Sequence, residues 1–178
     1  MLQRRAEFIA GRGIPVSSAT EGIVQQLTAR GVAHTIHEHV VSRTVADAMA
    51  LLPFDPNAYL KTVAFRLKAG GWVLAALRGA DRVDYKGLAA ALGVGRRDLH
   101  QLTPDEVASD LGYPIGGVGP VPPNAQTRTV FDEAAVEVLD TVYCGAGRED
   151  RTLEVRLADL IAACDGLVAP ISQPPPAA

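Results

Sequence analysis

Residues 59–77 read YLKTVAFRLKAGGWVLAAL, and this stretch decides which class of fold the chain can adopt. Two runs rich in aliphatic, aromatic and β-branched residues, 59–68 and 72–77, flank the pair Gly70 and Gly71. A glycine pair between two such runs is typical of a β-hairpin. The hairpin favours an α+β fold with a mixed or antiparallel sheet over a strict repeat of βαβ units.

Helical and extended patterns follow one another along the rest of the chain. The clearest helix start is TPDE, with Thr103 as N-cap, Pro104 in the first turn and Glu106 completing a capping box, and Gly112 follows the helix end. Further helices are expected at 18–30, 43–52, 83–93 and 158–164, and further strands at 34–41, 127–131, 136–144 and 152–157.

The length of 178 residues suits one domain with a sizeable core. We expect this domain to cover residues 1–169. The remaining residues, 170–178, read PISQPPPAA, a composition typical of a flexible tail.

Charge is distributed unevenly along the chain, although the total of −3 does not suggest a nucleic-acid-binding protein. Residues 61–97 carry eight basic and two acidic side chains, a net charge of +6, whereas residues 98–178 carry a net charge of −9. The basic segment is either a surface that faces a polyanion or an ordinary solvated face.

The sequence predicts a cytoplasmic protein without a membrane association. Its first residues, MLQRRAEFIAGRGIP, include basic side chains but no sustained apolar region, so no secretory signal is expected. No stretch has the length of a membrane span. Cys144 and Cys164 lie far apart in the sequence and indicate neither a disulfide framework nor a redox motif.

Several motifs that mark enzyme classes are missing from the sequence, including GxGxxG after a strand, the P-loop and GxSxG. The histidines also make a poor zinc site, because on a strand His37 and His39 share one face while His34 points the other way. We therefore expect neither a metal nor a cofactor.

Lys61 occupies an unusual place for a lysine. If Val63 and Phe65 face the core, Lys61 points the same way, because side chains alternate along a strand. A buried ammonium group costs free energy unless it meets an anion or lines a cavity. Lys61 is therefore either a functional cation or a side chain that reaches past the edge of the sheet to solvent.

Residues 112–120, GYPIGGVGP, start where the helix at 103–112 ends and contain four glycines and two prolines. They include no strong nucleophile or base. Backbone N–H groups of a glycine-rich loop approach a substrate carbonyl more closely than a β-carbon would permit. The stretch is either an ordinary loop or a site that uses the main chain itself.

Five segments in order, YLKTVAFRL, DRVDYKGLAAALG, LTPDEVASDLGYPIGGVGP, VFDEAAV and VYCGAG, resemble the YbaK / prolyl-tRNA-synthetase-associated domain family over about residues 30–165. The resemblance implies a barrel-like mixed β-sheet with flanking helices. It also implies a free-standing aminoacyl-tRNA deacylase that needs no metal.

Proteins of this family hydrolyse the ester between a wrong amino acid and the terminal ribose of a tRNA. The substrate is often tRNA(Pro) charged with Cys or Ala, and related members act on Ser- or Thr-charged tRNA. The resemblance thus implies mischarged aminoacyl-tRNA as partner, an aminoacyl-tRNA synthetase as a further candidate partner, and a monomer or homodimer.

The resemblance also assigns site residues. Lys61 and Gly116 fall on the family's catalytic lysine and glycine. Substrate-binding roles fall on Thr62, Gly117, His39 and Glu154. His39 and Glu154 stand where the relative compared has tyrosine and aspartate, so the identity of the amino acid substrate stays open.

Two other functions are compatible with the same residues. The chain could be a non-catalytic module that binds tRNA or a synthetase, or a hydrolase of small esters. Because an aminoacyl ester is already reactive, an editing hydrolase needs positioning and oxyanion stabilisation more than a strong nucleophile, and this favours the deacylase.

Overall fold

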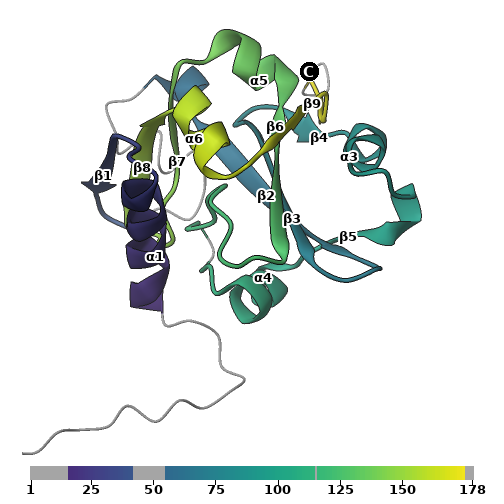
Figure 1. Cartoon of the computed structure of the whole chain (residues 1–178), viewed down its shortest axis with the longest axis horizontal. Helices are drawn as coiled ribbons and strands as arrows, with labels where there is room; N and C mark the ends of the chain where they lie inside the picture. The colour runs from purple at the N-terminus through teal and green to yellow at the C-terminus, as the bar shows by residue number, and fades with distance from the viewer. Residues whose placement is uncertain (1–15, 42–54, 115, 175–178) are drawn as a thin grey trace, which may run out of the picture.

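The computed structural model describes residues 16–41, 55–114 and 116–174. Its helices lie around a central set of strands (Figure 1). The helices are α1 (Val16–Ala29), α3 (Tyr85–Leu92), α4 (Pro104–Leu111), α5 (Glu133–Val138) and α6 (Leu157–Ala163), with 3-10 turns η1 (Pro56–Ala58) and η2 (Arg96–Asp98). The strands are β1 (His34–Glu38), β2 (Leu60–Leu67), β3 (Trp72–Arg78), β4 (Arg82–Val83), β5 (Leu99–Gln101), β6 (Thr127–Asp132), β7 (Thr141–Gly145), β8 (Arg151–Arg156), β9 (Leu167–Ala169) and β10 (Ser172–Gln173).

The strands form a mixed arrangement of three sheets. The largest has the order β5-β2-β3-β6-β9, in which β2, β3 and β5 pair antiparallel while β6 and β9 run parallel to their neighbours. An antiparallel sheet has the order β1-β8-β7, and β10 pairs with β4. The expected α+β fold with a mixed sheet is confirmed, and within the described ranges the strands do not close into a barrel.

The predicted hairpin is confirmed as β2 and β3. Leu60 pairs with Arg78 at the open end, and Arg66 pairs with Trp72 next to the turn. Gly70 and Gly71 have φ values of 98° and 84°, a left-handed conformation that residues with a β-carbon adopt only with strain.

Apolar clusters cover both faces of the five-stranded sheet. On one face, Leu60 and Leu74 join residues of α1, α4, α6 and the three-stranded sheet. On the other face, Phe65 and Val73 pack with Leu88 of α3. The strand alternation that placed Lys61 on the face of Phe65 therefore holds, and that face is the one covered by α3.

Local capping signals position the helices. Thr103 caps α4 in a capping box with Glu106, and Gly112 ends that helix in a left-handed conformation. Asp84 caps α3, and Gly93 ends it in the same way. The first helix starts before the predicted residue 18, and the predicted helix 43–52 lies outside the described residues. None of the described helices has the length and apolar character needed to cross a membrane.

The strand predicted for 136–144 is wrong in its first half. Residues 133–138 form α5, with Ala135 buried, and β7 begins only at Thr141. The alternation Val136, Glu137, Val138 fits a strand, but so short a pattern does not distinguish a strand from one or two turns of helix.

Residues 170–173, which the sequence assigns to a flexible tail, belong to the fold. Ile171 is buried, and its backbone N–H donates to the Asp132 carboxylate at 3.1 Å. The Ser172 hydroxyl donates to the same carboxylate at 2.8 Å, and Ser172 pairs with Val83 of β4. Residues 170–173 therefore belong to the folded part of the chain, while 175–178 lie outside the described residues.

The capping box of α4 predicts a pH dependence of stability. The Glu106 carboxylate accepts from the Thr103 N–H at 2.9 Å and from its hydroxyl, which lowers the pKa of Glu106 from 4.5 to about 2. A carboxyl with a lowered folded-state pKa stabilises the fold above its unfolded pKa. We expect this contribution to be lost as the pH falls from about 4.5 to about 2.

Urea unfolding of wild type and Glu106→Gln at a series of pH values measures this contribution. Glutamine keeps the capping geometry but carries no charge. The wild type should be the more stable protein at pH 6, and the difference should vanish towards pH 2. A difference that is the same at every pH would contradict the assignment.

Candidate active site

Two of the predicted site residues, Thr62 and Gly116, line one pocket of about 260 Å³. The pocket lies where β2 extends beyond its pairing with β5, which covers only Phe65–Leu67. Most of the other lining side chains are apolar: Val63, Ala64, Leu102, Pro104, Val107 and Val118. Gln101 adds a polar side chain. The pocket is thus a small, mainly apolar space between β2, α4 and the glycine-rich loop.

Thr62 brings a hydroxyl group to the wall of this pocket. Its Oγ1 atom is buried and has no hydrogen-bond partner among the described residues. A buried hydroxyl without a partner costs free energy, which makes Thr62 a candidate contact for a bound group.

Lys61 lies next to Thr62 on β2 but, by alternation, on the opposite face. It does not line the 260 Å³ pocket. Burial lowers the pKa of the Lys61 ammonium group, the negative charge of Asp81 opposes this change, and Arg82 adds to it. Asp81 is itself buried and pairs with Arg78 at 2.7 Å.

Gly116 is exposed and has a φ of 79°, which an alanine would adopt only at a cost of about 1–2 kcal/mol. It stands in a turn that the Gly117 N–H closes by donating to the Pro114 carbonyl at 3.0 Å. The Gly116 N–H itself has no backbone acceptor among the described residues. Gly116 itself lines the pocket.

Gly117 serves a different purpose, because its backbone groups are already bonded. Its carbonyl accepts from the Gly147 N–H at 2.8 Å, and a β-carbon at Gly117 would lie 2.7 Å from the backbone nitrogen of Arg148. Likewise, a β-carbon at Gly119 would collide with the carbonyl of Gly145. These glycines let the loop pack backbone to backbone on the turn between β7 and β8.

His39 and Glu154 lie on the three-stranded sheet. The His39 Nε2 atom is 3.0 Å from the Thr152 hydroxyl, and Glu154 contacts His37 rather than His39, with 2.5 Å between Oε2 and Nε2. No contact joins His39 or Glu154 to Lys61, Thr62 or Gly116 among the described residues.

The two sheets meet at a parallel bridge between Tyr59 and Tyr143. Tyr143 is paired with Glu154 on one side, and Tyr59 stands directly before β2, two residues ahead of Lys61. Burial raises the pKa of Tyr59 to about 12 and also raises that of Tyr143. The sequence did not single out Tyr59, Tyr143 or His37 as candidate site residues, because only the pairing of strands brings them together.

The described residues give little support to two other chemistries. They contain no group of three or more His, Cys, Asp or Glu side chains arranged to hold a metal ion. Cys144 and Cys164 are buried, and burial raises the pKa of both thiols, that of Cys164 to about 12. Neither thiol is therefore suited to act as a nucleophile.

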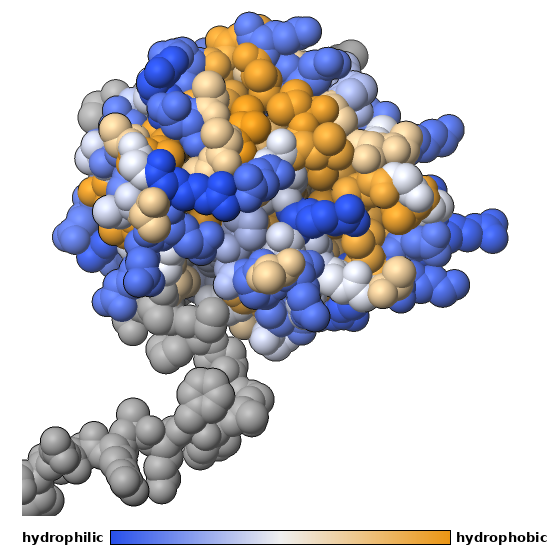
Figure 2. Space-filling view, in the orientation of Figure 1, coloured by the Kyte–Doolittle hydropathy of each residue, from blue (hydrophilic) through white to orange (hydrophobic). Residues whose placement is uncertain are grey.

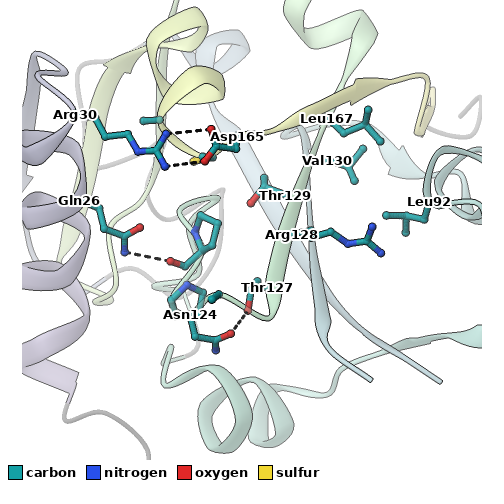
Figure 3. A pocket seen from close by; sticks show the side chains of 15 residues that line it. Gln26, Arg30, Leu92, Asn124, Thr127, Arg128, Thr129, Val130, Asp165 and Leu167 are labelled. Atoms are coloured by element: carbon teal, nitrogen blue, oxygen red, sulfur yellow. Dashed lines mark hydrogen bonds and ion pairs between the residues drawn. The ribbon is translucent and has the colours of Figure 1, made fainter. Parts of the chain in front are cut away.

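A larger pocket of about 610 Å³ lies elsewhere, between α1, β6 and α3 (Figure 3). None of the six predicted site residues lines it. Its size alone does not make it the active site, because the two predicted residues that line a pocket, Thr62 and Gly116, lie at the smaller one.

The chain is similar to known proteins in sequence and in fold. The pattern of the aminoacyl-tRNA editing domain matches residues 39–163. The proline–tRNA ligase of Kosmotoga olearia is 33% identical over 90 residues, which are 51% of this chain and 15% of the ligase. That of Geobacillus kaustophilus is 28% identical over 110 residues, 60% of this chain and 18% of the ligase. The chain thus spans less than a fifth of these relatives.

Two solved structures share the fold. The hypothetical protein APE2540 has a TM-score of 0.77 and 29% identity, with 85% of this chain and 99% of that chain covered. A proposed trans-editing enzyme for prolyl tRNA synthetase has a TM-score of 0.72 and 23% identity, with 87% and 97% covered.

The family match includes β2, the glycine-rich loop and β8, and so contains the whole candidate site. The chain therefore belongs to the aminoacyl-tRNA editing domain family.

Proposed function

We propose that the chain removes a wrong amino acid from tRNA in trans, with Cys- or Ala-charged tRNA(Pro), or a related Ser- or Thr-charged tRNA, as substrate. The observation that carries the proposal is the pocket shared by Thr62 and Gly116 within the editing-domain match. The similarity to two proline–tRNA ligases supports tRNA(Pro). The reaction would operate in the cytoplasm, together with tRNA charging.

The pocket suits a small amino acid side chain. Its walls include Val63, Ala64, Leu102 and Val107, and its volume is about 260 Å³. Apolar walls with a few polar groups are typical of sites that bind small ligands. In this proposal the side chain of the amino acid lies against these walls, and the Thr62 hydroxyl bonds a polar atom of the substrate.

Ester hydrolysis in such a site depends on stabilising the developing oxyanion. The N–H of Gly116 is a donor of the required kind, because a backbone dipole held in place stabilises negative charge without reorganising. Lys61 acts in this proposal as a cation that holds the ribose or the terminal phosphate. Gly117 positions the loop, while His39 and Glu154 form an outer part of the substrate site.

Purified protein and a panel of tRNAs charged with Cys, Ala, Ser or Thr test the proposal directly. At least one of these tRNAs should be deacylated, and Lys61→Ala should lower kcat/KM by about 100-fold, as for loss of a catalytic charge. Its free energy of unfolding should stay near that of wild type, because removing a partly desolvated ammonium costs little stability. If the protein binds charged tRNA but does not hydrolyse it, the chain is a non-catalytic binding module and the proposed activity is wrong.

Thr62→Val removes the unpartnered hydroxyl and keeps the shape of the side chain. We expect kcat/KM for deacylation to fall about 10-fold, while stability stays unchanged or rises, because the hydroxyl has no partner to lose. Thr129→Val is the matched control, since Thr129 is also buried but donates to the Pro120 carbonyl at 2.7 Å. That variant should lose about 1–3 kcal/mol of stability. If Thr62→Val keeps the wild-type kcat/KM, the Thr62 hydroxyl is not part of the site.

The basic segment 61–97 provides a surface for the tRNA in this proposal. Arg66 is bound to Glu106 and Asp110, and Arg78 to Asp81, so these cations are already paired. The exposed basic side chains of this segment with neither an ion pair nor a ring contact to a described residue are Lys68, Arg82, Lys86 and Arg97. Arg96 is also exposed, but its guanidinium lies over the Tyr85 ring. These four side chains, rather than the whole segment, are the candidates for phosphate contacts.

Phosphate contacts make binding depend on salt, because each contact releases a counterion. The double variant Lys86→Ala/Arg97→Ala should therefore lower the slope of log kcat/KM against log salt concentration by about 1–2. Arg156→Ala, which removes an exposed cation of the other sheet, should leave the slope unchanged. If the wild-type kcat/KM hardly changes with salt concentration, this surface does not contact the phosphates of the tRNA.

A further inference from the structure

The sheet β1-β8-β7 has one face in the apolar core and one polar face. Leu153 and Val155 of β8 are buried in the core. Side chains alternate along a strand, so Thr152 and Glu154 of β8 point to the other face. In the view of Figure 2, hydrophobic side chains gather where Figure 1 places β6, β9 and α3, whereas the side of β1 and α1 is mainly hydrophilic.

His37 and Tyr143 flank Glu154 on the polar face. Tyr143 lies opposite Glu154 in the pairing of β7 with β8, and His37 of β1 lies opposite Thr152. The His37 Nε2 atom is 2.5 Å from the Glu154 Oε2 atom, and the imidazole is the donor because a carboxylate accepts hydrogen bonds. Burial and the charge of Glu154 raise the pKa of Tyr143. The Glu154 carboxylate is therefore fixed by His37 and lies close to Tyr143.

Glu154 differs from the neighbouring carboxylates in its partners. Asp150 is bound by Arg148 at 2.8 Å and by Arg151 at 2.9 Å, and Glu38 is bound by Arg151 at 3.0 Å. No arginine or lysine of the described ranges forms an ion pair with Glu154, whose side chain is 33% exposed. Because a half-buried carboxylate is costly without a cation, Glu154 is suited to receive a cationic group from a ligand.

The glycine-rich loop lies on the same face of this sheet. Gly145 follows Tyr143 by two residues on β7, so a side chain at Gly145 would point to the polar face, and its β-carbon would collide with the Val118 carbonyl. Val118 lines the 260 Å³ pocket together with Gly116. From the spacing of strands and of residues along a strand, the Cα atoms of Gly145 and Glu154 lie about 8 Å apart. A ligand held at the loop therefore has Glu154 within its reach.

We propose that the Glu154 carboxylate binds the α-ammonium group of the aminoacyl ester, and that His37 is a positioning residue that holds this carboxylate. The proposal rests on the proposed function, which brings an aminoacyl ester to the glycine-rich loop. The α-amino group is mostly a cation near pH 7, and every aminoacyl-tRNA carries one next to the scissile bond. An ester with an acylated amino group, as in peptidyl-tRNA, lacks this cation and would be spared.

Two ligands that differ only at the α-nitrogen test the proposal. The first is the amide analogue of alanyl-adenosine, in which nitrogen replaces the ester oxygen, and the second is its N-acetyl derivative, which carries no charge. NMR titration of the full, isotope-labelled chain measures both dissociation constants without hydrolysis. We expect the N-acetyl compound to bind the wild type about tenfold more weakly, as for loss of one charge-assisted hydrogen bond.

Variants assign this preference to the two residues. Glu154→Gln should bind both compounds alike, and His37→Phe should lose most of the preference. His37→Gln, whose amide also donates, should keep it, which a merely structural role of the imidazole does not predict. Glu38→Gln removes an exposed carboxylate from the same strand and should leave the preference unchanged. Circular dichroism checks that each variant is folded, and His37→Ala replaces His37→Phe if the latter is not.

Three results would overturn the proposal: no saturable binding of the ammonium compound, equal binding of both compounds by the wild type, or a preference that Glu154→Gln keeps. A preference that His37→Phe keeps would exclude the role of His37. These results do not depend on turnover. If the chain deacylates tRNA but binds both compounds equally, the proposed function stands and the role of Glu154 is wrong. If it shows the preference but hydrolyses no charged tRNA, the role of Glu154 stands and the deacylase activity is wrong.

Discussion

The candidate site depends on one constraint, the contact between two backbone segments that have no room for a side chain. The loop at 117–119 lies against the turn that starts at Gly145, and a β-carbon at Gly119 or Gly145 would collide with the carbonyl opposite. A β-carbon at Gly147 would lie 2.7 Å from the backbone nitrogen of Thr20, whose hydroxyl donates to the Ala146 carbonyl at 2.6 Å. This contact joins α1, the glycine-rich loop and the three-stranded sheet.

Because of this contact, the glycines of the loop have different structural roles. Gly117 uses both its N–H and its carbonyl inside the protein, so it fixes the position of the loop. The turn closed by Gly117 holds Gly116 at the pocket of Thr62. A site that relies on one backbone donor needs this rigidity, because a displaced donor loses most of its effect on an oxyanion.

The sequence predicted those parts of the fold that local rules decide. The turn at Gly70 and the capping box at Thr103 depend on residues a few positions apart, and both were found as expected. The helix at 133–138 was missed because its short apolar pattern fits either structure. The contact of His37 with Glu154 and the bridge between Tyr59 and Tyr143 depend on which strands pair, and no local pattern carries that information.

The family resemblance assigns Lys61 and Thr62 to one site. Because side chains alternate along a strand, however, the two side chains lie on opposite faces of β2. Thr62 meets the apolar pocket, and Lys61 meets the charges of Asp81 and Arg82. In the proposed function, a substrate that contacts both residues passes over the edge of β2, where β5 pairs only with Phe65–Leu67. An aminoacyl end has this form, with a small side chain for the pocket and a ribose and phosphate that continue past the strand towards the cation. On this proposal the strand edge separates recognition of the amino acid from recognition of the nucleotide.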